Sequence, residues 1–177
     1  MQITIMSQNV QYRAHAEGRW SGLVETINKV NPDLLMLQEC DWLTNAYHRR
    51  AAEADFGKRL VVAPSNHLRT AVAWNPGRFT LAGCDTHYTA RLHHGYCAPR
   101  FTIPDLDPPL EAPLVAISTH LALYSAQTAA QEAQIVGARA YRHGGLAIIA
   151  GDLNHLRCAT SPCLACSDEE VDGNNEP

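Results

Sequence analysis

Three apolar runs that each end in a polar residue constrain the fold of this chain most strongly. They are residues 33–39 (DLLMLQE), 114–120 (LVAISTH) and 146–152 (LAIIAGD). Continuous apolar runs of this length are typical of strands that are buried on both faces. A shorter alternating segment, QITIMSQNV, predicts another strand that ends near Asn9. The chain is therefore predicted to fold around buried sheets with polar side chains at the strand ends.

Helical patterns separate these strands. Residues 18–30 carry apolar side chains at helical spacing, and Asn31 ends the pattern because a residue before proline disfavours the helical conformation. A second helix is expected over about 43–55. Ser125 is a suitable N-cap for a third helix that reaches about Tyr141.

Further strands are predicted between the second and third helices. Segments 59–64 and 69–75 form a strand pair with 65–67 in the turn, and 79–90 and 96–103 supply two more strands. The mixture of strands and helices predicts an α/β (α+β) fold.

Composition limits the class of protein. The 177 residues and a hydrophobic fraction of 46% suit one soluble domain. A formal net charge of -4 argues against a protein that coats nucleic acid by charge alone. No run approaches the roughly 18 apolar residues of a membrane span, and the first residues lack a signal-peptide pattern. A cytoplasmic protein without membrane insertion is therefore expected.

The strand ends carry polar residues of one chemical type: Asn9, Glu39, His120, Asp152 and Asn154. If the strands run in one direction within one core, these side chains meet at one edge. Carboxylate and amide oxygens suit Mg²⁺, and a nearby histidine can bind a phosphoryl oxygen or transfer a proton. Each residue also has a structural alternative, such as a turn, a helix cap or an Asx turn. Their joint occurrence in this order favours a site.

Four blocks, SQNVQY, NPDLLMLQE, ISTHLAL and AIIAGDLN, resemble the endonuclease/exonuclease/phosphatase superfamily in their order and spacing. These are metal-dependent phosphoesterases related to pancreatic deoxyribonuclease. The resemblance implies a two-sheet α/β sandwich of the deoxyribonuclease-like type over residues 1–156, with catalysis at one edge of the sheets. Residues 157–177 are expected to form a Cys-rich, then acidic, disordered tail.

The resemblance also implies a role for each residue at the strand ends. Glu39 would be the main ligand of Mg²⁺ (or Mn²⁺), with Asn9 beside it. Asp152 would orient or deprotonate the attacking water, and Asn154 would hold the phosphate and the local network. His120 would stabilise negative charge on the phosphoryl oxygens.

Arg69, at the start of segment 69–75, has two interpretations of equal weight. It is a further candidate for contact with the substrate phosphate, or a surface arginine at a strand end.

The chain departs from the family after the Gly-Asp-x-Asn block. In the family more strands follow, and a closing Ser-Asp-His motif supplies a catalytic histidine. Here Ser167 and Asp168 are followed by Glu169. The fold is therefore expected to be incomplete, with unpaired strand edges and an activity lowered by about 10² to 10⁴. A partner protein or self-association would then cover the exposed apolar face.

The six cysteines form two groups. The scattered group is expected in or near the core: Cys40, Cys84 and Cys97. The second group follows the strand-end block in an H-x2-C-x4-C-x2-C pattern: His155, Cys158, Cys163 and Cys166. These are ligand types that zinc accepts, although a tail without metal is favoured over a zinc site. A disulfide framework is less favoured because no secretory signal is present.

Two functions follow from the sequence. The leading one is a Mg²⁺-dependent phosphoesterase that hydrolyses phosphodiesters or phosphomonoesters, nucleic acid among them, and is impaired by the absent Ser-Asp-His segment. The alternative is a non-catalytic truncated remnant that binds phosphate ligands or a partner, with a zinc-bound tail. The sequence leaves the substrate open among DNA, RNA, inositol phosphates, lipid head groups and small nucleotides.

Overall fold

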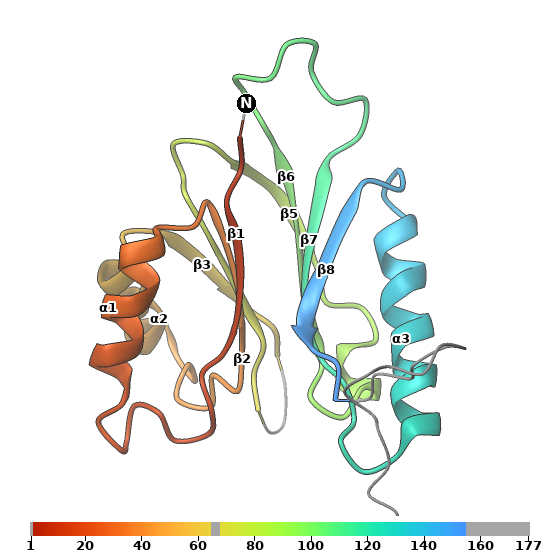
Figure 1. Ribbon diagram of the computed structural model, residues 1–177. Helices are drawn as coiled ribbons and strands as arrows, with labels where there is room; N and C mark the ends of the chain where they lie inside the picture. The colour runs from red at the N-terminus through yellow and green to blue at the C-terminus, as the bar shows by residue number, and fades with distance from the viewer. Residues whose placement is uncertain (1, 65–67, 155–177) are drawn as a thin grey trace, which may run out of the picture.

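The computed structural model describes residues 2–64 and 68–154. Its strands form two four-stranded sheets that face each other (Figure 1). In spatial order, the first sheet holds β1 (Ile5–Asn9), β2 (Leu34–Gln38), β4 (Ala71–Trp74) and β3 (Arg59–Val62). The second holds β5 (Thr80–Asp85), β6 (Tyr96–Thr102), β7 (Leu114–His120) and β8 (Ala147–Asp152). The predicted two-sheet α/β sandwich is confirmed.

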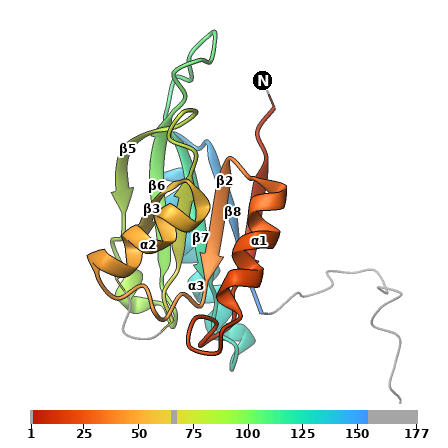
Figure 2. The ribbon, with the colours of Figure 1, turned by 90° about the vertical axis from the view of Figure 1, so that its left-hand side faces the viewer.

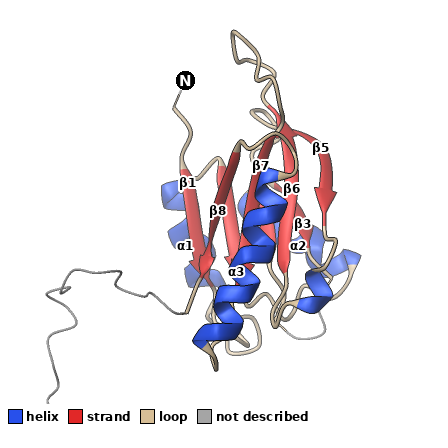
Figure 3. Ribbon diagram, turned by 90° about the vertical axis from the view of Figure 1, so that its right-hand side faces the viewer, coloured by secondary structure: helices blue, strands red, loops and turns tan. Residues whose placement is uncertain are grey.

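Helices cover the outer faces of both sheets. Figure 2 shows α1 (Trp20–Val30) and α2 (Ala46–Phe56) in front of the first sheet. Figure 3 shows α3 (Ala126–Tyr141) lying across the second sheet. A short 3-10 helix, η1 (Thr89–Arg91), lies in the connection between β5 and β6. No helix in the described ranges is long and apolar enough to cross a membrane.

The helix starts follow their capping residues. Ser125 caps α3 as predicted, because its Oγ accepts a hydrogen bond from the backbone N–H of Thr128 at 3.1 Å. Helix α2 begins at Ala46, later than the pattern predicted, because the side chain of Asn45 accepts from the backbone of His48 at 3.0 Å and fixes the first turn there.

The parallel strand pairs bring the polar strand ends together. β1 and β2 run parallel, and Asn9 lies beside Gln38. β7 and β8 also run parallel, and His120 lies beside Asp152. Both pairs therefore end at the same edge of the sandwich, with β1 and β8 facing each other across the sheets (Figure 1).

Apolar side chains fill three layers, and β2 contributes to two of them. Its side chains alternate, so Leu34 and Met36 pack between the sheets while Leu35 and Leu37 pack against α1 and α2. The layer between the second sheet and α3 includes Tyr96, Val115, Ile117 and Val136. Burial on both faces explains why the sequence of β2 is continuously apolar.

A buried polar contact next to the strand ends crosses the layer between the sheets. The amide of Gln38 on β2 donates from Nε2 to Ser118 Oγ on β7 at 3.0 Å. Ser118 in turn donates to the carbonyl of Leu37 at 2.8 Å. All three groups are buried, so the contact fixes the relative position of the two sheets next to the site.

One expectation needs correction, and three others concern residues outside the described ranges. Cys40 and Cys97 are buried, but Cys84 is exposed, since β5 is the outermost described strand of its sheet. The turn at 65–67, the domain boundary at 156 and the proposed zinc ligands lie outside the described residues: His155, Cys158, Cys163 and Cys166.

At the end of the sheets opposite β3 and β5, the outermost described strands, β1 and β8, expose apolar side chains. Ile5 on β1 is 40% exposed, and Ile149 on β8 is 44% exposed. An apolar cavity of about 510 Å³ lies beside β8 and α3 and is lined by Leu153 among others.

Candidate active site

Four of the predicted site residues lie at neighbouring strand ends. Asn9 ends β1, Glu39 directly follows β2, His120 ends β7 and Asp152 ends β8. Glu39 has a φ of 62°, in the left-handed region that residues with a side chain seldom adopt. Its backbone thus turns sharply as it leaves the strand, and surrounding contacts must hold it there.

Asn9 links the two carboxylates of the site. Its Nδ2 donates to Glu39 Oε1 at 2.8 Å and to Asp152 Oδ2 at 2.9 Å. Its Oδ1 accepts from the backbone of Gln11 at 2.9 Å, which fixes the amide in this orientation. The other oxygen of Glu39 accepts from the backbone of Tyr12 at 2.6 Å. These hydrogen bonds stabilise the carboxylates of Glu39 and Asp152 side by side, despite the repulsion between two negative charges.

His120 faces the carboxylates from the second sheet. Its side chain is 5% exposed, and its Nε2 lies 3.9 Å from Asp152 Oδ2. Burial lowers the pKa of His120 below its ordinary value of 6.5, although Asp152 and Glu39 oppose this effect. The ring stacks on that of His94, with centroids 4.2 Å apart. His120 is therefore set to act as a neutral imidazole at neutral pH.

The donor set suits a divalent cation. One potential ligand atom from each of Glu39, His120 and Asp152 lies within 4.8 Å of the others. Two carboxylates favour Mg²⁺ or Mn²⁺, whereas an imidazole is also accepted by transition metals. Asn9 presents its N–H group to the carboxylates, so in this arrangement it orients Glu39 and does not offer its oxygen to a cation.

The segment after β8 is both a turn and part of the site. Asp152 Oδ1 accepts from the backbone N–H of Asn154 at 3.1 Å, which forms the Asx turn that was the structural alternative for this segment. The side chain of Asn154 donates to the carbonyl of Leu121 at 2.6 Å, so it holds the segment that follows His120. Asn154 therefore connects the end of β8 to the segment after β7.

Gly151 is required by the close approach of β7. A Cβ at this position would lie 1.8 Å from the carbonyl oxygen of Thr119. Only glycine lets the backbone of β8 come this near to β7 immediately before Asp152.

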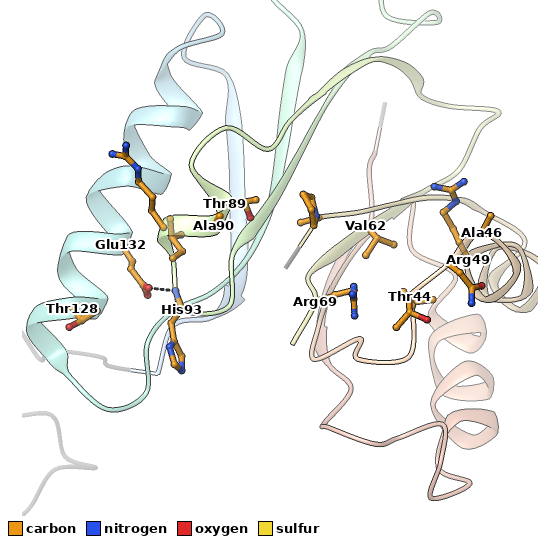
Figure 4. A pocket seen from close by; sticks show the side chains of 16 residues that line it. Thr44, Ala46, Arg49, Val62, Arg69, Thr89, Ala90, His93, Thr128 and Glu132 are labelled. Carbon is orange, nitrogen blue, oxygen red and sulfur yellow. Dashed lines mark hydrogen bonds between the residues drawn. The ribbon is translucent and has the colours of Figure 1, made fainter. Parts of the chain in front are cut away.

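Two cavities flank the residues at the strand ends. One of about 590 Å³ is lined by Ser7, Asn9, Gln38, Gly151, Asp152, Leu153 and Asn154. The other, of about 830 Å³, lies between α2 with the β3–β4 strand ends on one side and η1 with α3 on the other (Figure 4). The smaller cavity is lined directly by Asn9 and Asp152, whereas the larger one lies farther along the same edge.

Arg69 lies beside the cluster formed by Asn9, Glu39, His120 and Asp152, and outside it. Its guanidinium donates to the carbonyl of Asp41 at 3.2 Å, and its own carbonyl accepts from the backbone of Cys40 at 2.9 Å. The side chain lines the larger cavity (Figure 4).

Two residues of this region escaped the sequence analysis. His94 precedes β6 and stacks on His120, a contact that only the folding of the second sheet creates. Glu132 on α3 is 3% exposed, and its carboxylate accepts from the backbone of His93 and of Ala122. Helical spacing places Glu132 on the buried face of α3 with Ala129 and Val136, which is the signal that could have revealed it.

Solved structures share this fold. Humanized TDP2 from D. rerio is 20% identical with a TM-score of 0.67, and the match covers 88% of this chain and 63% of that one. The human Nocturnin catalytic domain with a bound sulfate anion is 18% identical with a TM-score of 0.64, covering 86% and 65%. An endonuclease/exonuclease/phosphatase family protein from Bacteroides thetaiotaomicron is 13% identical with a TM-score of 0.63, covering 86% and 63%. The chain thus spans less than two thirds of each of these structures.

The sequence itself also matches a known family, although no curated protein matches it. The profile of the Endonuclease/Exonuclease/phosphatase family aligns with residues 6–170, which include every residue of the cluster described above. Strand-end carboxylates, a buried histidine and the two-sheet sandwich agree with that match, so the chain belongs to the Endonuclease/Exonuclease/phosphatase family.

Proposed function

We propose that this chain hydrolyses phosphate ester bonds with the help of Mg²⁺ or Mn²⁺ held mainly by Glu39, which Asn9 orients. The observation that carries this proposal is the convergence of Glu39, His120 and Asp152, whose ligand atoms lie within 4.8 Å of one another in a chain of this family. When bound, the cation would neutralise charge on the phosphate and favour ionisation of a water molecule.

The side chains would divide the chemistry as follows. Asp152 would accept a proton from the attacking water, whose oxygen forms a bond to phosphorus as the ester oxygen leaves. His120, neutral because burial lowers its pKa, would donate a hydrogen bond to a phosphoryl oxygen. Asn9 would hold both carboxylates in place, as its two hydrogen bonds already do.

Asn154 would act mainly through the segment after β7. Its bond to the carbonyl of Leu121 fixes the backbone beside His120, so its contribution is positional as well as a contact with phosphate. The leaving oxygen would take its proton from solvent. A single missing acid/base group costs about 10² to 10⁴ in rate, so slow turnover is compatible with this proposal.

The substrate is proposed to be a phosphodiester, with nucleic acid as one class. A similar D. rerio TDP2 structure, 18% identical with a TM-score of 0.63, is complexed with a single strand DNA product. At this identity the likeness shows a shared fold alone. Nucleic acid as a substrate of this chain is therefore part of the proposal.

Hydrolysis of bis-p-nitrophenyl phosphate tests the proposal. Release of p-nitrophenol should require Mg²⁺ or Mn²⁺, stop with EDTA and fall by about 10² or more in Asp152→Asn. Folded protein that binds the metal without turnover would contradict hydrolysis and support the alternative of a non-catalytic binding protein.

A further inference from the structure

The larger cavity has a fixed position relative to the catalytic cluster. Along the shared edge the strands follow the order β1, β2, β4, β3 in one sheet and β8, β7, β6, β5 in the other. The catalytic residues occupy the ends of β1, β2, β7 and β8. The cavity of about 830 Å³ comes next, between residues adjoining β3 and β4 and residues preceding β6. The cavity is therefore the neighbour of the cluster along this edge.

On each sheet, a residue that lines the cavity is connected to a residue of the cluster through one intermediate residue. The carbonyl of Arg69 accepts from Cys40, the residue after Glu39. On the opposite side, His93 lines the cavity and precedes His94, whose ring stacks on His120. Figure 4 shows Arg69 and His93 on opposite sides of the open space.

The charge of the cavity wall differs from that of the whole chain. Its lining includes Arg49, Arg69 and Arg91, and Glu132 is the one acidic residue among the described residues that line it. The buried carboxylate of Glu132 is already bonded to the backbone of His93 and of Ala122. The chain as a whole carries a formal net charge of -4, so this wall is a local concentration of positive charge.

The arginines of this wall are not paired with acids. Within the described part of the chain, no salt bridge joins Arg49, Arg69 or Arg91 to a carboxylate. Arg91 lies over the ring of Tyr88, with its guanidinium carbon 4.7 Å from the centroid. Other basic residues do form such pairs, as Arg78 does with Asp33 and Arg139 with Asp85. Arg49 and Arg69 therefore keep donors available for an anionic ligand.

We propose that this cavity is a subsite for a second phosphate of the substrate, held by Arg69 together with Arg49 while the first phosphate lies at the catalytic cluster. The proposal rests on the proposed function and adds the substrate class: a molecule with at least two phosphate groups. A volume of about 830 Å³ is far larger than one phosphate needs and has room for the sugar and base, or ring, that carries it. An oligonucleotide and a small multiply phosphorylated molecule share this chemistry.

Paired substrates test the subsite. Turnover of thymidine dinucleotides that carry an extra 5′ or 3′ phosphate is compared with that of bis-p-nitrophenyl phosphate, which has one phosphate. Arg49→Ala and Arg69→Ala should lower the ratio of kcat/KM between the two kinds of substrate about tenfold, since each removes a charge-assisted contact. Arg69→Lys should restore part of the ratio.

Arg50→Ala is the matched control. Arg50 is exposed, adjoins Arg49 on α2 and does not line the cavity, so its removal changes the net charge equally. The ratio should stay at its wild-type value in this variant. Equal ratios in Arg49→Ala, Arg69→Ala and Arg50→Ala would overturn the subsite.

A binding measurement separates the subsite from catalysis. Fluorescence anisotropy of a labelled single-stranded oligonucleotide in EDTA should show weaker binding to Arg49→Ala and Arg69→Ala than to Arg50→Ala. Inorganic pyrophosphate should displace the oligonucleotide if the subsite binds small polyphosphates, and should not displace it if the subsite requires a nucleic-acid strand. If bis-p-nitrophenyl phosphate is not hydrolysed at all, the proposed function fails, but the binding measurement still tests the subsite. Identical binding of the oligonucleotide by all three variants would refute the subsite.

Discussion

The side chain of Asn9 donates a hydrogen bond to Asp152 at 2.9 Å, although the two residues are 143 positions apart. Asn9 ends a strand of the first sheet and Asp152 ends a strand of the second. The same Nδ2 also bonds to Glu39 at 2.8 Å. One amide therefore ties together both sheets at the place where the proposed metal would lie.

This bridge predicts how metal affinity depends on Asn9 and Glu39. Asn9→Ala should weaken Mn²⁺ or Mg²⁺ binding by about 10- to 100-fold, the usual cost of losing a group that orients a ligand. Glu39→Gln should weaken it further because a carboxylate ligand itself is lost. Isothermal titration calorimetry measures both. The control is Glu25→Gln, which removes an exposed charge on α1; affinities that match this control in all variants would contradict the site.

The residues after β8 should differ in their effect on activity. Asp152→Ala should abolish measurable hydrolysis of bis-p-nitrophenyl phosphate, because it removes the group that takes the proton from water. Asn154→Ala should reduce hydrolysis by a smaller factor, since it removes the bond to the Leu121 carbonyl. Circular dichroism should be unchanged in both. Loss of folded structure in the two variants, or full activity, would show that the pair serves only the turn.

Stability should depend on the protonation of His120. Burial lowers its folded-state pKa below 6.5, whereas the unfolded chain has the ordinary value. As the pH falls through about 6.5, the unfolded state gains a proton that the folded state resists, so the free energy of unfolding decreases. This contribution is fully present above the unfolded pKa and is lost as the pH falls towards the folded pKa.

Urea denaturation in EDTA, at about pH 7.5 and pH 5.5, measures this effect. His120→Asn should lose less stability between these two values than the wild type. His48→Asn, near the start of α2, controls for the loss of an imidazole elsewhere. An identical pH dependence in the wild type and His120→Asn would exclude His120 as the group responsible.

Substitution by alanine should change the stability of the fold in opposite directions at two glycines. Gly151→Ala should destabilise the fold by more than about 1 kcal/mol, because the new Cβ would lie 1.8 Å from the Thr119 carbonyl oxygen. Gly137→Ala should stabilise it by about 0.5 to 1 kcal/mol, since this position is inside α3 and a Cβ there meets nothing within 4 Å. Thermal unfolding followed by circular dichroism compares them; a stable Gly151→Ala would mean that β7 and β8 are less closely paired.

Local patterns predicted most of the secondary structure. The apolar run before Glu39 indicated a strand buried on both faces, and β2 is such a strand, with alternate side chains in two layers. Ser125 marked the start of α3 correctly. The start of α2 was predicted too early, because apolar spacing carries no information about the cap that Asn45 forms with the backbone of His48.

The sequence by itself determined which residue types stand at the strand ends. A buried strand requires an apolar run, and the residues where the chain leaves the core are polar. Only the tertiary structure decided that Asn9 bonds to Asp152, that His94 stacks on His120 and that Arg69 lies in a neighbouring cavity. These relationships depend on the parallel pairing of strands far apart in the chain and on the packing of one sheet against the other. Periodicity describes how each segment meets the core, but the positions of distant segments follow from the combined packing of all of them.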